Sequence, residues 1–212
     1  MPLFADRRHA GRYLAQRLER FRGTVDLVLA LPPGGVPVAY EVAQVLAVPL
    51  DVFVVAKLGF PGREELAMGA VASGGVRVLD EDLDELSVPR HVIELAATHE
   101  AHEVERLERL YRVGRPPLDV ANKSVVLVDD GLATAAVTRA AVRALRARLA
   151  DRIVVAVPIG SYESVESMKA EADDVVCATT PSPSHDAMEA SYDDRATPSD
   201  TEIRDLLAAS TS

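Results

Sequence analysis

The chain of 212 residues is 48% hydrophobic, which suits one domain spanning residues 1–212 with a substantial core. Its 33 acidic residues outnumber its 23 basic residues and give a net charge of −10. A surface of that sign argues against non-specific nucleic-acid binding, because it would repel phosphates.

Two further features indicate where such a protein works. The lone cysteine, Cys177, cannot form an internal disulfide, so we expect a cytoplasmic protein in a reducing environment. No apolar run is long enough to span a bilayer, and the N-terminus is charged from Asp6 onward. We therefore expect neither a signal peptide nor a membrane partner.

The first predicted element is an amphipathic helix from Asp6 to Phe21, with apolar residues on one face and arginines on the other. We interpret its arginine face as solvated. A strand over Asp26–Leu31, a helix over Val36–Leu46 and a second strand over Leu50–Ala56 follow. Strand, helix and strand with short joints are typical of a parallel α/β sheet.

The joint after the first strand reads Pro32-Pro33-Gly34-Gly35. It is either a tight turn or a loop whose bare glycine amides approach an anion. Lys57 directly follows the second strand. A lysine there is either solvated or functional, since open α/β sheets bind ligands at the carboxyl edge.

The middle of the chain reads as a hairpin followed by a long helix. Apolar runs on both sides of Ser73-Gly74-Gly75 predict the hairpin. Residues 87–112 predict the helix, with Pro89 near its start. Its His99 and His102 can share a helix face, but the sequence indicates no third metal ligand. We interpret them as structural residues on an ion-paired face.

The stretch from Lys123 to Arg148 organises the rest of the chain. An apolar strand, Val125–Val128, ends in Asp129 and Asp130, and a helix is predicted from Thr138 to Arg148. Two carboxylates at a strand end can hold sugar hydroxyls or a metal ion. The free amides at a helix start form an anion site. The pattern therefore indicates a sugar phosphate.

The last third continues the alternation. Strands are predicted over Ile153–Ile159 and Asp174–Ala178, with a short helix over Val165–Ala172 between them. A final helix over Thr201–Ala208 carries a capping box formed by Ser199 and Glu202.

The central stretch resembles the ribosyl-phosphate motif of type I phosphoribosyltransferases, an apolar strand with two acidic residues and a loop written G-x-A-T-G-x-T. Asp129, Asp130, Gly131, Ala133 and Thr134 match it. The chain departs from the family at three positions, with proline for arginine, alanine for glycine and valine for threonine, at Pro33, Ala135 and Val137. If the loop needs a left-handed residue at position 135, alanine resists that conformation by about 1–2 kcal/mol.

The resemblance implies a fold as well as a reaction. The fold is α/β, a parallel core sheet flanked by helices over residues 24–180, with a β-hairpin flap near Gly59, Pro61 and Gly62. A small hood would come from the N-terminal helix and the tail, residues 181–212. The reaction is transfer of ribose 5-phosphate from phosphoribosyl pyrophosphate to a nitrogen acceptor such as a nucleobase, with Mg²⁺.

The resemblance also implies roles for particular residues. Asp129 and Asp130 would hold the ribose hydroxyls, directly or through Mg²⁺, and Lys57 would supply a cation. Gly34 and Gly35 would approach the pyrophosphate, and Tyr192 could stack on the acceptor base or simply pack. The 5-phosphate would be bound along the loop, by Gly131, Leu132, Ala133, Thr134, Ala135, Ala136 and Val137.

Two alternatives remain at this stage. The three departures suit a ligand-binding regulatory protein that has lost catalysis. The acidic pair also resembles the start of a phospho-acceptor receiver domain, but only residues 131–212 follow it, fewer than the roughly one hundred a receiver needs. The acceptor and the oligomeric state stay open, a homo-oligomer included.

Overall fold

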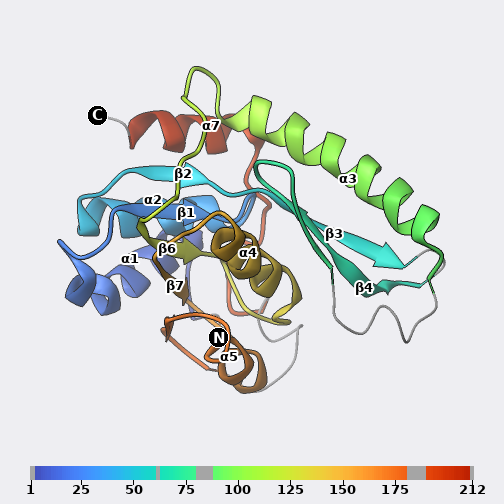
Figure 1. Cartoon of the computed structure of the whole chain (residues 1–212). Helices are drawn as coiled ribbons and strands as arrows, with labels where there is room; N and C mark the ends of the chain where they lie inside the picture. The colour runs from blue at the N-terminus through green and yellow to red at the C-terminus, as the bar shows by residue number, and fades with distance from the viewer. Residues whose placement is uncertain (1–2, 61–62, 80–87, 181–189, 211–212) are drawn as a thin grey trace.

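The computed structural model describes residues 3–60, 63–79, 88–180 and 190–210, with the backbone alone for residues 63–67 (Figure 1). Its centre is a parallel sheet of five strands in the order β2-β1-β6-β7-β8. The strands of this sheet are β1 (Leu27–Ala30), β2 (Leu50–Val52), β6 (Ser124–Val128), β7 (Arg152–Val157) and β8 (Asp174–Cys177). The predicted parallel α/β core is confirmed.

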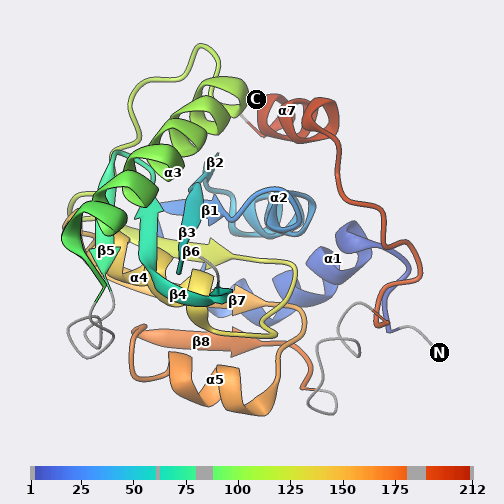
Figure 2. The same ribbon diagram turned by 90° about the vertical axis from the view of Figure 1, so that its right-hand side faces the viewer.

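Helices cover both faces of this sheet (Figure 2). Val28 and Val126 are in register and pack beneath α1 (Arg7–Leu18) and α2 (Gly35–Leu46). Leu29 and Leu127 point the opposite way, toward α4 (Ala136–Ala147) and α5 (Tyr162–Met168). Because strand side chains alternate between faces, two apolar layers require strands that are apolar throughout.

A second, antiparallel sheet carries the long helix. It contains β3 (Val55–Phe60), β4 (Arg63–Ala72) and β5 (Val76–Leu79) in that order. Leu58 and Met68 pack under α3 (Arg90–Tyr111), whereas Val78 packs toward α4. Figure 1 shows α3 lying along the β3–β4 hairpin. The predicted hairpin at Ser73-Gly74-Gly75 is confirmed as the β4–β5 turn.

The predicted second strand, Leu50–Ala56, is wrong as a single strand, because it divides into β2 and β3. The Phe53 N–H still donates to Ala30 O in the parallel sheet, at 2.9 Å. The Val54 N–H instead donates to Ser73 Oγ, and the Ser73 N–H donates to Val54 O, both at 2.8 Å. The chain therefore changes sheets between two consecutive buried residues.

Element boundaries elsewhere differ by a few residues from those predicted. A 3₁₀ turn, η1 (Glu19–Phe21), ends the first helix. The short helix α5 begins three residues early because Ser161 caps it, accepting from the Ser164 N–H at 3.1 Å. Ser199 caps α7 (Asp200–Ala209) through the Glu202 N–H, as predicted. Pro61, Gly62 and residues 181–189 lie outside the described residues.

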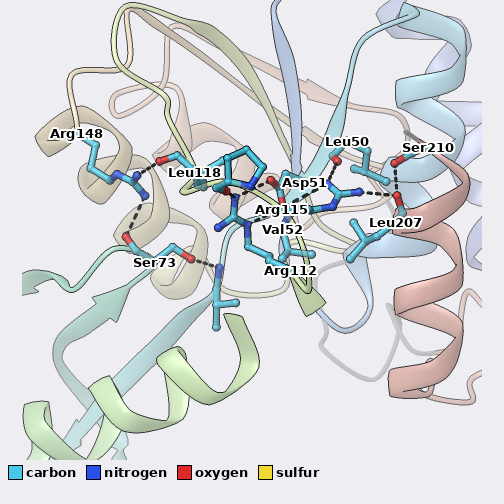
Figure 3. A network of polar contacts seen from close by, with 12 residues as sticks. Leu50, Asp51, Val52, Ser73, Arg112, Arg115, Leu118, Arg148, Leu207 and Ser210 are labelled. Carbon is cyan, nitrogen blue, oxygen red and sulfur yellow. Dashed lines mark hydrogen bonds and ion pairs between the residues drawn. The ribbon is translucent and has the colours of Figure 1, made fainter. Parts of the chain in front are cut away.

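A buried ion network joins β2 to α3 and α7 (Figure 3). The Arg112 guanidinium donates to both carboxylate oxygens of Asp51, at 2.9 and 3.0 Å. Arg115 donates to Leu50 O at 2.6 Å and also to Leu207 O. The Asp51 and Arg112 side chains are each 11% exposed. Because the pair is buried, removal of either partner would leave the other charge buried and uncompensated.

No helix in the described part of the chain is long and apolar enough to cross a membrane. The strand order has a direct consequence for the site. Because β1 and β6 are neighbours and parallel, the loops that follow them meet at one edge of the sheet.

Candidate ribose-phosphate site

The loop after β1 lies directly against the acidic pair after β6. A Cβ atom on Gly34 would be 2.1 Å from Asp130 Oδ2, and a Cβ on Gly35 would be 2.7 Å from Val128 O. The Leu31 N–H also donates to Val128 O, at 2.9 Å, which ties the two strand ends together. Glycine is therefore required at position 35, where a Cβ would meet backbone atoms, and at position 34 a Cβ would push the Asp130 carboxylate aside.

The two glycines differ in their amides. The Gly35 N–H donates to Leu31 O at 2.9 Å and is already used. The Gly34 N–H has no hydrogen-bond acceptor within the described residues. Of the pair predicted to face an anion, Gly34 is thus the one with an available donor.

Asp129 is held in an environment that opposes its charge. Burial raises the pKa of the Asp129 carboxyl well above its usual range, and the neighbouring charge of Asp130 raises it further. The Asp130 N–H donates to Asp129 Oδ1 at 2.8 Å and partly offsets both effects. A carboxyl of this kind gains from a ligand that brings hydroxyl donors or a cation.

Asp130 is contacted by residues from both ends of the chain. The Arg7 Nε donates to Asp130 Oδ2 at 2.7 Å, and the Tyr192 hydroxyl donates to Asp130 O at 2.6 Å. The Arg7 side chain is only 16% exposed. The interpretation of the helix arginines as solvated is therefore wrong for Arg7, whose role depends on a tertiary contact that helical periodicity does not encode.

Tyr192 packs and leaves little surface for a ligand. The residue is 5% exposed, and its ring centroid lies 5.7 Å from that of Phe4. Burial raises the pKa of its hydroxyl, which stays a donor. The structure therefore contradicts the suggested stacking of Tyr192 on an acceptor base, because Phe4 and Arg7 already cover the ring.

The loop from Gly131 to Val137 divides into an anchor and a set of free amides. Leu132 is fully buried, donates to Ile159 O at 2.9 Å and accepts from the Ser161 N–H at 3.0 Å. The expectation that the Leu132 amide binds phosphate is therefore wrong. Ser164, which sequence analysis missed, donates its hydroxyl to Ala133 O at 2.9 Å and fixes the next peptide.

The amides from Ala133 to Val137 have no acceptor among the described residues. They lead into the first turn of α4, where positive dipole and unpaired N–H groups favour an anion. Ala135 has φ −79° and ψ −4°, which is right-handed, so alanine is not strained there. This stretch directly follows the acidic pair, which places anion donors next to hydroxyl acceptors.

Lys57 was predicted at the carboxyl end of a parallel strand. That placement is wrong, because Lys57 lies inside the antiparallel strand β3. With Ala136, Val137 and Arg139 it lines a cavity of about 50 Å³ between α4 and the antiparallel sheet. It therefore lies beside the start of α4. A second cavity of about 180 Å³, lined by Arg7, Asp6, Asp194 and Glu202 among others, separates α1 from the tail.

The donor set of the acidic pair fits Mg²⁺, which binds one or two carboxylates and completes its shell with water and phosphate oxygens. No group of three or more metal-ligating side chains occurs in the part of the chain that the structure describes. His99, on the surface of α3, is 83% exposed, and its nearest ionic neighbour is Glu100.

Comparisons with known proteins show the family to which the chain is similar. The phosphoribosyl transferase domain family matches residues 5–194. A protein from two strains of Mycobacterium tuberculosis, provisionally named a phosphoribosyl transferase, is 45% identical over 182 residues. The match covers 85% of this chain and 41% of the relative, so the chain spans about two fifths of the length of these curated relatives.

Solved structures show the same fold. The protein TT1426 from Thermus thermophilus superposes with a TM-score of 0.88 at 38% identity and covers 99% of both chains. AQ2163 from Aquifex aeolicus has a TM-score of 0.50 at 12% identity, covers 88% of this chain and 85% of its own, and shows the fold alone.

Proposed function

Because this chain belongs to the phosphoribosyl transferase domain family, we propose that it transfers ribose 5-phosphate between phosphoribosyl pyrophosphate and a nitrogen acceptor such as a nucleobase. One observation carries the proposal. Two carboxyl groups at the end of β6 are followed at once by a turn with free amides, and a glycine loop closes against them. Sugar hydroxyls, a phosphate and a second anion all find suitable groups there.

In the proposed complex, Asp129 and Asp130 accept hydrogen bonds from the ribose hydroxyls. The amides of Ala133 to Val137 bind the 5-phosphate, and the Gly34 amide faces the pyrophosphate. Lys57 adds positive charge beside the start of α4. These assignments follow the available donors and acceptors, and they leave out Leu132, Gly35 and Tyr192 as ligand groups.

The proposed reaction needs positioning more than proton transfer. The bond from the anomeric carbon to the pyrophosphate oxygen breaks, and the electron pair leaves with pyrophosphate. The acceptor nitrogen forms the new bond with its lone pair and releases its proton to water. Positive charge develops on the ribose, so nearby carboxylates stabilise it while the amides hold both ends of the substrate. Mg²⁺, when bound, neutralises the leaving pyrophosphate.

The remaining expectations become part of the same proposal. We place the hood in α1 and the tail, the flap in the β3–β4 hairpin, and the protein in the cytoplasm, with all 212 residues in one domain. A non-catalytic ligand-binding protein is the second candidate, favoured by Val137, which supplies no hydroxyl at the start of α4. The receiver interpretation is set aside, since the family match spans both sides of the acidic pair.

Calorimetric titration with phosphoribosyl pyrophosphate and Mg²⁺ tests binding, and pyrophosphate release with a panel of nucleobases tests transfer. Asp130→Asn should weaken binding roughly tenfold or more, since a hydrogen bond to a charged group contributes about 1.5–3 kcal/mol. Asp119→Asn, at a side chain 70% exposed, is the control. If phosphoribosyl pyrophosphate binds but releases no pyrophosphate with any base of the panel, the non-catalytic ligand-binding protein is favoured. Absence of binding would refute both.

A further inference from the structure

Arg7 is bound to Asp130, the second carboxylate of the acidic pair, in the free protein. Its Nε donates to Asp130 Oδ2 at 2.7 Å, and its Nη1 donates to Ala196 O at 2.7 Å. Its guanidinium carbon lies 5.4 Å from the Tyr192 ring centroid. We call this set of contacts, from Arg7 to Asp130, Ala196 and Tyr192, the Arg7 latch.

The latch rests on a pairing between the N-terminal segment before α1 and the segment that precedes α7, which run side by side in Figure 2. The Phe4 N–H donates to Ser191 O, and the Asp193 N–H donates to Phe4 O, both at 2.9 Å. The Tyr192 hydroxyl then attaches the tail to Asp130 O. Arg7 is therefore positioned by the tail as well as by its own helix.

The latch competes with the ligand proposed for the same carboxylate. Asp130 Oδ2 is already bound by Arg7 and faces Gly34 on another side. A ribose hydroxyl or a hydrated Mg²⁺ bound at Asp130 Oδ2 would compete with Arg7 for that oxygen, and a guanidinium repels a cation. A ligand that uses Asp130 Oδ2 must therefore displace Arg7 or accept a poorer contact.

The structure also provides a place for the displaced side chain. Arg7 lines the cavity of about 180 Å³ between α1 and the tail. The carboxyl-bearing residues Asp6, Asp194 and Glu202 line the same cavity. Arg8 also lines this cavity, but its Nε donates to Glu41 at 2.7 Å. A guanidinium that turns away from Asp130 thus still has carboxylates near it, which lowers the cost of its release.

We infer that Arg7 controls access to the ribose site: it holds Asp130 in the free protein and leaves it when the ribosyl ligand binds. The inference rests on the proposed function, because it needs a ligand that uses Asp130. It predicts that a fraction of the intrinsic affinity is lost in opening the latch, since only the open form binds. The opposite arrangement, in which Arg7 orients Asp130 for the ligand, predicts the opposite change on mutation.

Three variants separate these arrangements. Arg7→Gln removes the ion pair, and Arg7→Lys keeps the charge but loses the guanidinium fork. Arg12→Gln is the matched control, because Arg12 lies on the same helix, is 54% exposed and pairs only loosely with Glu41 at 3.3 Å. Each variant is titrated with phosphoribosyl pyrophosphate and Mg²⁺, and its free form is unfolded in urea.

The latch predicts that Arg7→Gln binds roughly tenfold more tightly than the parent, although its free form is less stable. Arg7→Lys should lie between the two, and Arg12→Gln should bind like the parent. A merely structural Arg7 would lower affinity and stability together.

Binding by the parent with equal or weaker binding by Arg7→Gln overturns the latch and leaves the proposed function standing. Binding by Arg7→Gln alone supports the latch. No binding by any of the four proteins refutes the proposed function, and the latch with it.

Discussion

At the scale of single residues, Asp129 lies in an environment that disfavours its ionised form, although the proposed function uses its carboxylate. Its pKa is raised by burial and by Asp130, so the folded protein holds a proton there more tightly than the unfolded chain does. The resulting stability is complete below the unfolded pKa of about 3.9 and is lost as pH rises through the folded pKa. Above that range the ionised Asp129 costs stability.

Asp129→Asn should therefore reduce the loss of unfolding free energy as pH rises above about 4, because asparagine does not ionise. It also keeps the oxygen that accepts from the Asp130 N–H. The same change should weaken binding of phosphoribosyl pyrophosphate roughly tenfold. Urea unfolding from pH 4 to pH 8 and calorimetry measure the two effects. If the variant and the parent lose stability in parallel with rising pH, the raised pKa is wrong.

For the loop from Gly131 to Val137, the structure leads to a different prediction from the one that the motif alone would give. Ala135 is right-handed and 8% exposed, so Ala135→Gly relieves no strain and removes a buried methyl group, costing roughly 0.5–1 kcal/mol. Val137 is 36% exposed in the first turn of α4. Val137→Thr adds a hydroxyl beside the free amides and should tighten binding roughly tenfold.

Val113→Thr, at a position 74% exposed beyond α3, is the matched control for Val137→Thr. Calorimetry of the three variants should order them as Val137→Thr tightest, with Ala135→Gly and Val113→Thr no better than the parent. A gain in affinity from Ala135→Gly would mean that the loop changes its backbone conformation when the ligand binds.

At the scale of elements, the division between β2 and β3 depends on one distant side chain. Ser73 is fully buried, and its Oγ accepts from the Val54 N–H. Ser73→Ala leaves that N–H without its partner and should cost about 1–3 kcal/mol. The midpoint of urea unfolding measures the loss.

Ser167→Ala serves as the control, because its hydroxyl donates only to a carbonyl of its own helix, Ser164 O at 2.9 Å. It should change the unfolding free energy much less. An equal loss in the two variants would show that Ser73 is not what holds the crossing between the sheets.

The same crossing shows why sequence patterns predicted most elements but not this one. Strands and helices follow from local apolar periodicity, and the strand before Asp129 and the helix after it are found in this way. Phe53 and Val54 are both apolar, so nothing local marks the change of sheet. Its cause, Ser73, lies 19 residues further along the chain.

The candidate site also divides into features set by neighbouring residues and features set by tertiary contacts. The acidic pair, the glycine loop and the free amides could be predicted, because each is set by a few consecutive residues. Arg7, the burial of Leu132 and the placement of Lys57 could not, since each depends on which surface packs against it. Arg7 and Asp130 are 123 residues apart.

At the scale of the whole molecule, Asp51 joins segments that are distant in sequence. Asp51→Ala would leave Arg112 and Arg115 partly buried without their carboxylate. Breaking a buried pair in this way should cost about 3–5 kcal/mol, and thermal and urea unfolding should both report it.

A surface ion pair on α3, the helix that Arg112 caps at its C-terminal end, is the natural comparison. The Glu103 and Arg106 side chains are 42% and 57% exposed, so Glu103→Gln should change stability little, because water screens such a pair. Comparable losses in Asp51→Ala and Glu103→Gln would show that the network of Figure 3 is not a structural centre.

The neighbouring positions of β1 and β6 also determine when the site can form. Asp26 and Ser124, which join the starts of these strands, are 98 residues apart, whereas the contact between Val54 and Ser73 spans 19. Closing the longer loop costs more chain entropy, so the antiparallel sheet can form early and the β1–β6 pair late. During synthesis β1 must wait for nearly the next hundred residues to emerge, and the glycine loop meets the acidic pair only then. A folding intermediate with its hairpins complete would still lack the proposed ribose site.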